Sequence, residues 1–234
     1  MKINFHYTYI LCFVLALGSC KKDNYDAPST TLNGRLVYKG EPINVEFGQV
    51  NLELWQPGFG KNAAIGVAVA QDGSYSSLLF NGNYKLTIST GQGPFMWKTN
   101  TAGKNDSIPL SISGNQTLDV EVTPYYMVRN AQISFASGMI NSTFKVEKII
   151  TDVNAKDIER VTLYVNRTQF VSGANNDANA NLTITPTTDW NNVSLSASLP
   201  TISPKQNYLF ARIGVKISGV EDLIFSPTQR IETP

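Results

Sequence analysis

Apolar and polar residues alternate with a period of two through most of the chain after residue 30. The first clear stretch places Leu32, Gly34 and Leu36 on one face, with Asn33 and Arg35 on the other. Alternation of this kind predicts half-buried β-strands, and turns rich in Gly and Pro separate one stretch from the next. Further stretches with the pattern in the first half of the chain are Val50–Leu54, Ile65–Val69, Tyr84–Ile88, Ile108–Ile112 and Leu118–Val122.

The second half of the chain repeats the pattern with different motifs. Its longest alternation is Leu209–Ile217, whose opposite parity carries Tyr208, Phe210, Arg212 and Lys216. One apolar and one polar face predict an antiparallel sheet with its polar face in water. Short strands and frequent turns, with no pattern of ordinary helix length, favour β-sandwiches.

We therefore expect an all-β protein with two consecutive antiparallel β-sandwich domains. The alternation is interrupted at Thr123-Pro124, which divides the strands into residues 30–124 and residues 125–234. Each part has about the length of an ordinary sandwich domain. The expectation is that the two parts are independent folding units.

The first 20 residues differ from everything that follows. Lys2 is followed by the apolar run Tyr9–Leu17 and by two small residues before Cys20. This order is typical of a secretory signal peptide, and the run is shorter than the ~20 residues that cross a bilayer. Leu17-Gly18-Ser19-Cys20 resembles the lipobox of bacterial lipoproteins, which implies that residues 1–19 are removed and that Cys20 carries a lipid. The alternative is a leader in which this cysteine is incidental.

A polar tether, residues 20–29, would then connect the lipid to the first strand. Its segment Lys21–Asp26 resembles the charged export signals that follow the lipidated cysteine in Bacteroidetes surface lipoproteins. The resemblance implies an outer-membrane protein that is anchored by Cys20 and faces the cell exterior. The alternative is a plain solvated tether with no sorting role.

The composition excludes several classes of function. Removing residues 1–19, which hold one lysine and no acid, leaves 18 basic and 18 acidic side chains and a formal net charge of zero, so nucleic acid is not an expected partner. The only histidine, His6, and one of the two cysteines, Cys12, lie in the leader. The mature chain therefore lacks Ser-His-Asp triads, Cys-His dyads and His or Cys metal sites. No metal, cofactor or catalytic residue is expected, although the sequence leaves open a pair of carboxylates of the kind that glycosidases use.

Four aromatic residues are the candidates for ligand binding. Trp55 has the parity of Asn51 and Glu53, hence of the polar face of its strand, while Phe59, Phe95 and Trp97 are in stretches expected to be loops. Sugars present CH faces to aromatic rings and hydroxyls to polar groups, so exposed rings beside polar residues suit glycan binding. The alternative is that these rings cover a sheet, pack between domains or contact a partner.

Two short motifs concern other chemistry. The stretch Gly173–Asn181 spaces oxygen-bearing side chains like the start of a calcium loop, but it lacks the central Gly and the closing Glu, which favours a solvated loop. Asp106-Ser107-Ile108 resembles the O-glycosylation site of Bacteroidetes proteins, which makes Ser107 a candidate for modification.

The order of strands and turns up to Leu86 resembles the transthyretin-like, carboxypeptidase-regulatory type of sandwich. The second half, which lacks a cysteine pair, is more similar to a fibronectin-III sandwich than to a true immunoglobulin domain. Nearly the whole chain resembles a Bacteroidetes lipoprotein family catalogued as domain of unknown function 3823. The motifs that carry this likeness are Cys20–Pro28, Glu53–Gly58, Gln71–Tyr75, Phe80–Leu86 and Val122–Tyr126.

The resemblance implies an accessory part of an outer-membrane polysaccharide-uptake system. Its implied partners are a TonB-dependent transporter and the substrate-binding lipoprotein of that transporter. Two functions are left open by the residues. One is a non-enzymatic module that binds glycan, and the other is a structural spacer or docking subunit with no glycan site of its own.

Overall fold

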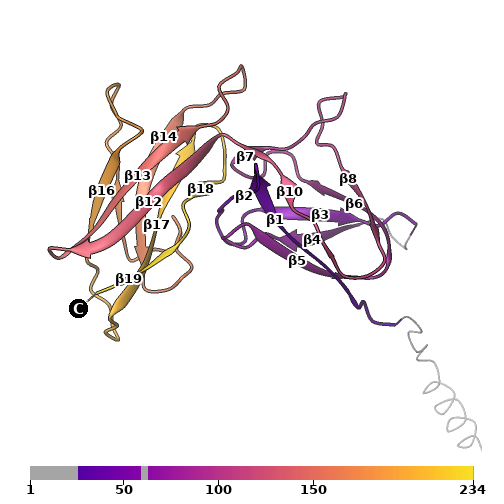
Figure 1. The fold of residues 1–234 in the computed structure, drawn as a ribbon, viewed down its shortest axis with the longest axis horizontal. Helices are drawn as coiled ribbons and strands as arrows, with labels where there is room; N and C mark the ends of the chain where they lie inside the picture. Colours follow the sequence, from indigo (N-terminus) through magenta and orange to yellow (C-terminus); the bar gives the residue numbers. More distant parts are fainter. Residues whose placement is uncertain (1–25, 59–62, 234) are drawn as a thin grey trace, which may run out of the picture.

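The computed structural model describes residues 26–58 and 63–233, and these form strands and turns without a helix. The tether residues that it describes lead directly into the first domain (Figure 1). Within the described residues no helical segment offers the length and apolar character that membrane crossing requires. The predicted signal peptide and Cys20 lie outside the described residues.

Two sheets face each other in the first domain (Figure 1). The first sheet is organised around the long strand β1, which pairs with β5 and β2 in antiparallel fashion and with β9 and β10 in parallel. The second sheet has the antiparallel order β4-β3-β6-β8. The strands are β1 (Thr30–Tyr38), β2 (Glu41–Pro42), β3 (Asn51–Trp55), β4 (Ala64–Ala68), β5 (Ser74–Leu79), β6 (Gly82–Ile88), β8 (Ile108–Ile112), β9 (Gln116–Thr117) and β10 (Val120–Glu121).

A short ladder leads out of the first domain. Strand β7 (Phe95–Met96) pairs with β11 (Thr123–Pro124), which directly precedes the second domain. The stretch that holds β7 was expected to be a loop, and this expectation was wrong for Phe95 and Met96. Their pairing with β11 satisfies backbone groups that a buried loop would leave without partners.

The second domain packs a three-stranded sheet, β12-β13-β16, against a larger sheet around β14 and β17. The larger sheet adds β15 beside β14, and β18 and β19 beside β17, all antiparallel. The strands are β12 (Tyr126–Ala136), β13 (Met139–Lys148), β14 (Ile158–Asn166), β15 (Ala178–Asn181), β16 (Val193–Ser198), β17 (Tyr208–Ile217), β18 (Ile224–Phe225) and β19 (Gln229–Glu232). The predicted class, two consecutive β-sandwich domains, is confirmed, with the parallel pairs of β1 as the departure from antiparallel pairing.

Strand β17 is buried on both faces in its central part, contrary to the expected wet face. Arg212 is 1% exposed although it has the predicted outward parity. Its Nη1 donates to the carbonyl of Val45 in the first domain at 3.0 Å, and its Nε donates to the carbonyl of Val171. The guanidinium also lies over the Phe225 ring, 3.7 Å from its centroid. The outward face of β17 is therefore covered by Val171 and Phe225 of the second domain together with Val45 of the first.

Further contacts join the domains at separate points. The amide of Phe225 donates to the carbonyl of Asn44 at 3.0 Å, and the amide of Gly93 donates to Asp222 Oδ2 at 2.7 Å. Arg129 of β12 pairs with Glu41 of β2. Buried apolar side chains of both domains form one continuous cluster. Whether each half folds alone stays a prediction, and these contacts are what a separated half would lose.

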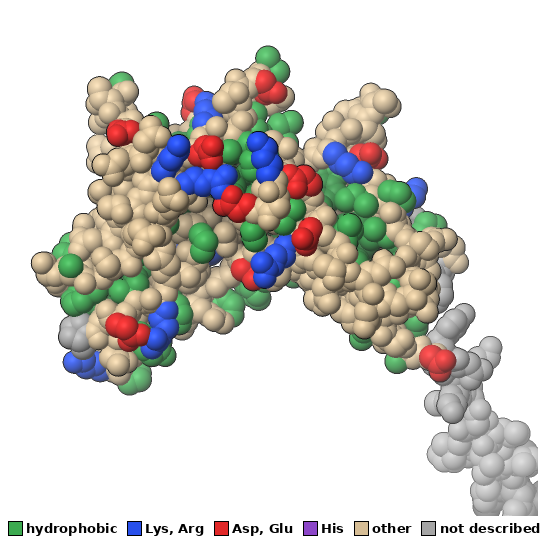
Figure 2. Space-filling model, viewed as in Figure 1, with side chains coloured by type: hydrophobic (Ala, Val, Ile, Leu, Met, Phe, Trp, Pro, Cys, Tyr) green, Lys and Arg blue, Asp and Glu red, His purple; other side chains and the backbone are tan. Residues whose placement is uncertain are grey.

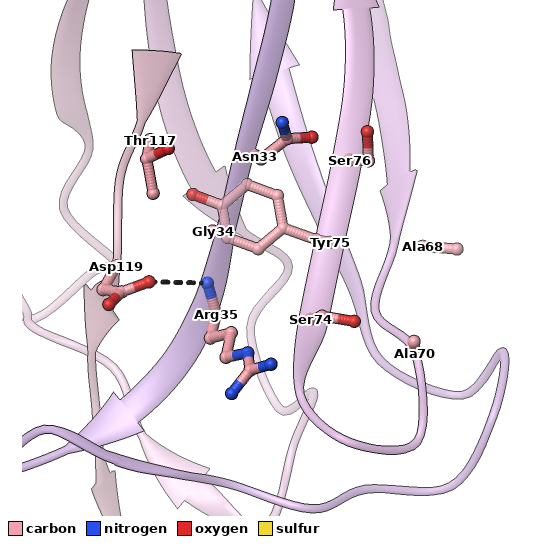
Figure 3. A pocket seen from close by; sticks show the side chains of 10 residues that line it. All are labelled: Asn33, Gly34, Arg35, Ala68, Ala70, Ser74, Tyr75, Ser76, Thr117 and Asp119. Carbon is pink, nitrogen blue, oxygen red and sulfur yellow. Dashed lines mark hydrogen bonds between the residues drawn. The ribbon is translucent and has the colours of Figure 1, made fainter.

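A break in the hydrogen-bond ladder beside β1 determines which residue can occupy position 34. The chain between β9 and β10 passes over Gly34, where an added Cβ would lie 1.7 Å from the carbonyl oxygen of Leu118. Tyr75 lies opposite Gly34 and donates from its hydroxyl to the same oxygen at 2.6 Å. Asp119 Oδ1 accepts the Arg35 amide at 2.9 Å, in place of a backbone carbonyl of the ladder (Figure 3).

We predict that Gly34→Ala destabilises the protein by about 3 kcal/mol, because a methyl group must displace backbone rather than a flexible side chain. Gly66→Ala in β4 is the matched control, since nothing lies within 4 Å of its added Cβ. Urea unfolding followed by circular dichroism measures both variants. Equal stability of Gly34→Ala and wild type would contradict the close approach of the Leu118 carbonyl to Gly34.

A second prediction concerns Asp222, whose burial raises its pKa. The Gly93 amide and Lys216 lower this pKa, while the charges of Glu221 and Glu46 raise it further. A raised pKa means that the folded state binds this proton more tightly, so stability is gained as pH falls through the folded pKa. Asp222→Asn keeps an acceptor for Gly93 and removes this titration. The stability advantage of Asp222→Asn over wild type should therefore be largest near neutral pH and shrink toward pH ~4.

Parallel unfolding curves of the two proteins at several pH values measure this difference. Exposed Glu159→Gln serves as the control for the removal of a carboxylate as such. A pH-independent difference for Asp222→Asn would show that the buried carboxyl is not the titrating group.

Candidate functional site

The outward face of the β4-β3-β6-β8 sheet carries Trp55, as its parity predicted. Trp55 is half-buried, while Leu52 and Leu54 of the same strand point into the core and are fully buried. Its indole Nε1 donates to Glu53 Oε2 at 3.1 Å. The other oxygen of Glu53 accepts a hydrogen bond from the hydroxyl of Ser89. The indole is thus held against the sheet by the Glu53 carboxylate, which is in turn hydrogen-bonded by Ser89 at the end of β6.

The strands beside Trp55 differ in what they place next to the ring. On β4 the outward residues are Ala64, Gly66 and Ala68, all exposed, and Ala64 is directly opposite Trp55. On β6 the opposite residue is Lys85, also exposed. Small residues on one side cannot cover an indole, and the ammonium and carboxylate beside it can hydrogen-bond a polar ligand. Chemically, this face offers a flat aromatic surface bordered by a donor and an acceptor.

The other aromatic candidates do not join this face. Phe95 and Trp97 are buried, 5% and 7% exposed, so their expected exposure was wrong. Trp97 Nε1 donates to the carbonyl of Asp106 at 2.8 Å, and Phe95 belongs to the short β7-β11 ladder. Their burial favours the alternative that these rings pack near the domain junction. Phe59 lies outside the described residues.

A wide polar groove lies on the other sheet of the first domain, with a volume of about 790 Å³ (Figure 3). The ring of Tyr75 reaches across its floor, and Asn33, Arg35, Ser76 and Thr117 line its sides. Tyr75 is buried, and desolvation raises the pKa of its phenol. Because the Tyr75 ring on the floor is fixed by its hydrogen bond to Leu118 beside Gly34 and the lining has no exposed ring, this groove is better explained as a consequence of the fold.

A smaller pocket at the domain junction contains aromatic residues that the sequence reasoning missed. Phe47 and Phe170 are 56% and 42% exposed, and their rings meet edge to face with centroids 5.1 Å apart. They line this pocket together with Arg212, which β17 parity had placed in water. Each phenylalanine lies in a polar loop, which is a signal for an exposed ring. Nothing in the linear sequence could have paired the two loops.

The surface around the junction carries charges of both signs. Figure 2 shows Lys, Arg, Asp and Glu side chains gathered near the middle of the molecule in this view, with uncharged surface over much of the remainder. Arg129 contributes ion pairs there with Glu41 and Glu147. No broad patch of one sign is visible on this face.

The calcium-like stretch is engaged in structural contacts. Asp177 binds Arg167 in a bidentate ion pair, and the hydrogen bonds from Arg167 hold the pKa of Asp177 below its usual range. Asn179 and Asn181 belong to β15, and Asn181 Oδ1 accepts from Thr162 at 2.6 Å. Among residues 26–58 and 63–233 no group of three His, Cys, Asp or Glu side chains is placed to hold a metal.

Ser107 directly precedes β8 and is half-buried, with its amide bonded to Asp106 Oδ1 at 2.8 Å. Its modification stays a prediction. So does the lipidation of Cys20, which lies in the part of the chain that the structure does not describe.

Comparison with protein families assigns both domains. The model of the DUF3823 N-terminal domain, described as a protein of unknown function, matches residues 30–123, and the model of the DUF3823 C-terminal domain matches residues 126–230. The chain belongs to the DUF3823 family. The resemblance seen in the sequence is thereby confirmed. Comparison with curated proteins gave no match.

Solved DUF3823 structures share the whole two-domain arrangement. A family member from Parabacteroides merdae is 34% identical with a TM-score of 0.75, and one from Bacteroides ovatus is 30% identical with a TM-score of 0.75. Each comparison covers 88% of this chain and 100% of the other. A protein from Bacteroides uniformis described as "a putative carbohydrate binding protein" shares the fold at 17% identity and a TM-score of 0.68, over 88% of this chain and 99% of that one.

Proposed function

We propose that this DUF3823 protein is a non-enzymatic surface lipoprotein that binds glycan as an accessory component of an outer-membrane polysaccharide-uptake system. The observation that carries the proposal is the placement of Trp55. A tryptophan on the outer face of a sheet, fixed by Glu53 and bordered by Ala64, Gly66 and Lys85, is what stacking against a sugar ring requires.

Two further considerations support the proposal. The Bacteroides uniformis protein of the same fold carries a carbohydrate-binding description, and a mature chain without histidine or free cysteine lacks the usual means of nucleophilic catalysis. A lipid on Cys20 would hold the protein at the outer membrane, where a transporter and its substrate-binding lipoprotein would be its partners.

The second candidate function is a spacer or docking subunit of the transporter complex with no glycan site. It is favoured by the burial of Phe95 and Trp97 near the junction and by the contacts that hold the two domains together. Trp55 separates the two candidates. Its ring packs in neither the core nor the junction and is partly exposed to water, which a glycan site explains and a spacer does not.

We predict that Trp55→Ala weakens oligosaccharide binding about five- to tenfold, the loss expected for about 1 kcal/mol of ring stacking. Trp55→Phe should retain part of the affinity because it retains a ring. Isothermal titration of the mature protein against a panel of plant and host oligosaccharides measures the effect. Leu78→Ala, at an apolar side chain 59% exposed in β5, is the matched control. Absence of binding in wild type would favour the spacer, whereas binding that is unaffected by Trp55→Ala would show that Trp55 does not carry the glycan site.

The anchor is tested separately. Cys20→Ala removes the only thiol that could take the lipid at this position, so the protein should leave the membrane fraction or stay unprocessed. Fractionation of cells followed by mass determination of the mature chain measures both outcomes. Normal processing and membrane retention of the variant would contradict a lipobox. A separate test, protease treatment of intact cells that express the wild type, shows whether the domains face outward.

A further inference from the structure

The junction of the two domains contains a pocket of about 240 Å³ whose walls come from both. The first domain contributes the loop around Phe47 and the side chain of Gln71, and the second contributes the loop that begins at Phe170. Arg212 of β17 lies at its inner side. A volume somewhat below the ~300–1,000 Å³ of sites for drug-sized ligands suits one sugar ring rather than a longer oligosaccharide.

The mouth of the pocket exposes two apolar rings. Phe47 and Phe170 belong to different domains, touch each other edge to face, and are among the few large apolar side chains that are exposed in the described residues. A ring pair that served only to join the domains would gain most by being buried. Two rings that remain exposed to water at the edge of a polar pocket are instead typical of a ligand-binding surface.

The interior of the pocket has hydrogen-bonding capacity that the protein does not use. Gln71 Nε2 donates to the carbonyl of Gln169 at 2.8 Å, but its buried Oε1 has no donor within hydrogen-bonding distance in the described structure. Arg212 donates from Nε and Nη1 to two carbonyls, whereas a guanidinium has five N–H groups. Arg212 thus has N–H groups beyond those two hydrogen bonds, while Gln71 Oε1 is enclosed by protein atoms.

The charge in the pocket is close to balanced. Among the described residues no carboxylate lies within ion-pair distance of Arg212, but Glu46 also lines the pocket and its charge acts on the guanidinium. A second carboxylate brought by a ligand would be repelled by Glu46. The pocket is therefore better matched to a neutral ligand with hydroxyl groups than to an acidic one.

We propose that this pocket is a saccharide subsite built jointly by the two domains, which takes one neutral sugar ring. The CH face of the sugar contacts Phe47 and Phe170, and one hydroxyl accepts from Arg212. The subsite rests on the proposed glycan-binding function and adds a second contact region separate from Trp55.

The test compares Phe47→Ala, Phe170→Ala and the double variant with wild type, using titration against neutral malto-, cello-, xylo- and manno-oligosaccharides. Both rings are exposed, so the variants should fold, which thermal unfolding checks. Each single change should weaken binding about two- to tenfold, and Phe170→Tyr should retain binding because it retains the ring. Leu78→Ala again controls for the loss of an exposed apolar side chain.

A second measurement locates the sugar directly. The side-chain amide signals of Gln71 and the Nε–H signal of Arg212 in a ¹⁵N spectrum of the mature protein should shift on adding the sugar and should not shift in the double variant. Oligogalacturonate, an acidic probe, should bind more weakly than the neutral probes. Tighter binding of oligogalacturonate would overturn the assignment to neutral sugars.

The outcomes separate this inference from the proposed function. If Trp55→Ala weakens binding while the phenylalanine variants behave like wild type, the junction subsite is wrong and the proposed function stands. If only the phenylalanine variants lose affinity, the junction is the binding site and the assignment of Trp55 is wrong. If wild type binds no glycan of the panel, both are overturned.

Discussion

The burial of Arg212 is the constraint on which the junction depends. Removing a guanidinium from water costs several kcal/mol, and burial lowers the pKa of Arg212 to about 10, so the side chain stays charged near neutral pH. Charge-assisted hydrogen bonds to the carbonyls of Val45 and Val171, at about 1.5–3 kcal/mol each, together with the Phe225 ring, offset a cost of this size. One of these carbonyls belongs to the first domain and the other to the second. The hydrogen bond to Val45, and the part of the burial that the first domain supplies, therefore exist only while the two domains are in contact.

This dependence explains why a ligand site can lie across the junction. A pocket with walls from two domains loses its shape if the domains rotate, and ordering them on binding would reduce the affinity. Here the contacts of Arg212, the Gly93–Asp222 hydrogen bond and the Asn44–Phe225 hydrogen bond fix the arrangement in advance. The rings of Phe47 and Phe170 are thus held in place before any ligand arrives.

Sequence patterns predicted the strands well because each strand buries one face, which leaves a period of two in the residues. Leu52 and Leu54 are buried and Trp55 faces outward, as parity requires. The same reasoning failed for Arg212, because parity assigns a residue to a face and cannot tell whether another domain covers that face. It also failed for Phe95, which a two-residue ladder joins to Pro124, and for Trp97, whose indole bonds to the carbonyl of Asp106 within the same stretch.

The same limit governs the candidate sites. Trp55 could be found from the sequence because its neighbours on the strand reveal its face and its partner Glu53 is two residues away. Phe47 and Phe170 are separated by more than a hundred residues, and their contact exists only because β17 brings the loops of two domains together.

A binding surface that uses both regions would be extended, with a flat contact at Trp55 and an enclosed one at the junction. Such a surface distributes its affinity over several weak contacts, since each stacked ring supplies only about 1 kcal/mol of the ~8 kcal/mol that micromolar binding needs. It would therefore favour chains of several sugar units over single ones, which is the selectivity that an accessory protein of a polysaccharide-uptake system requires.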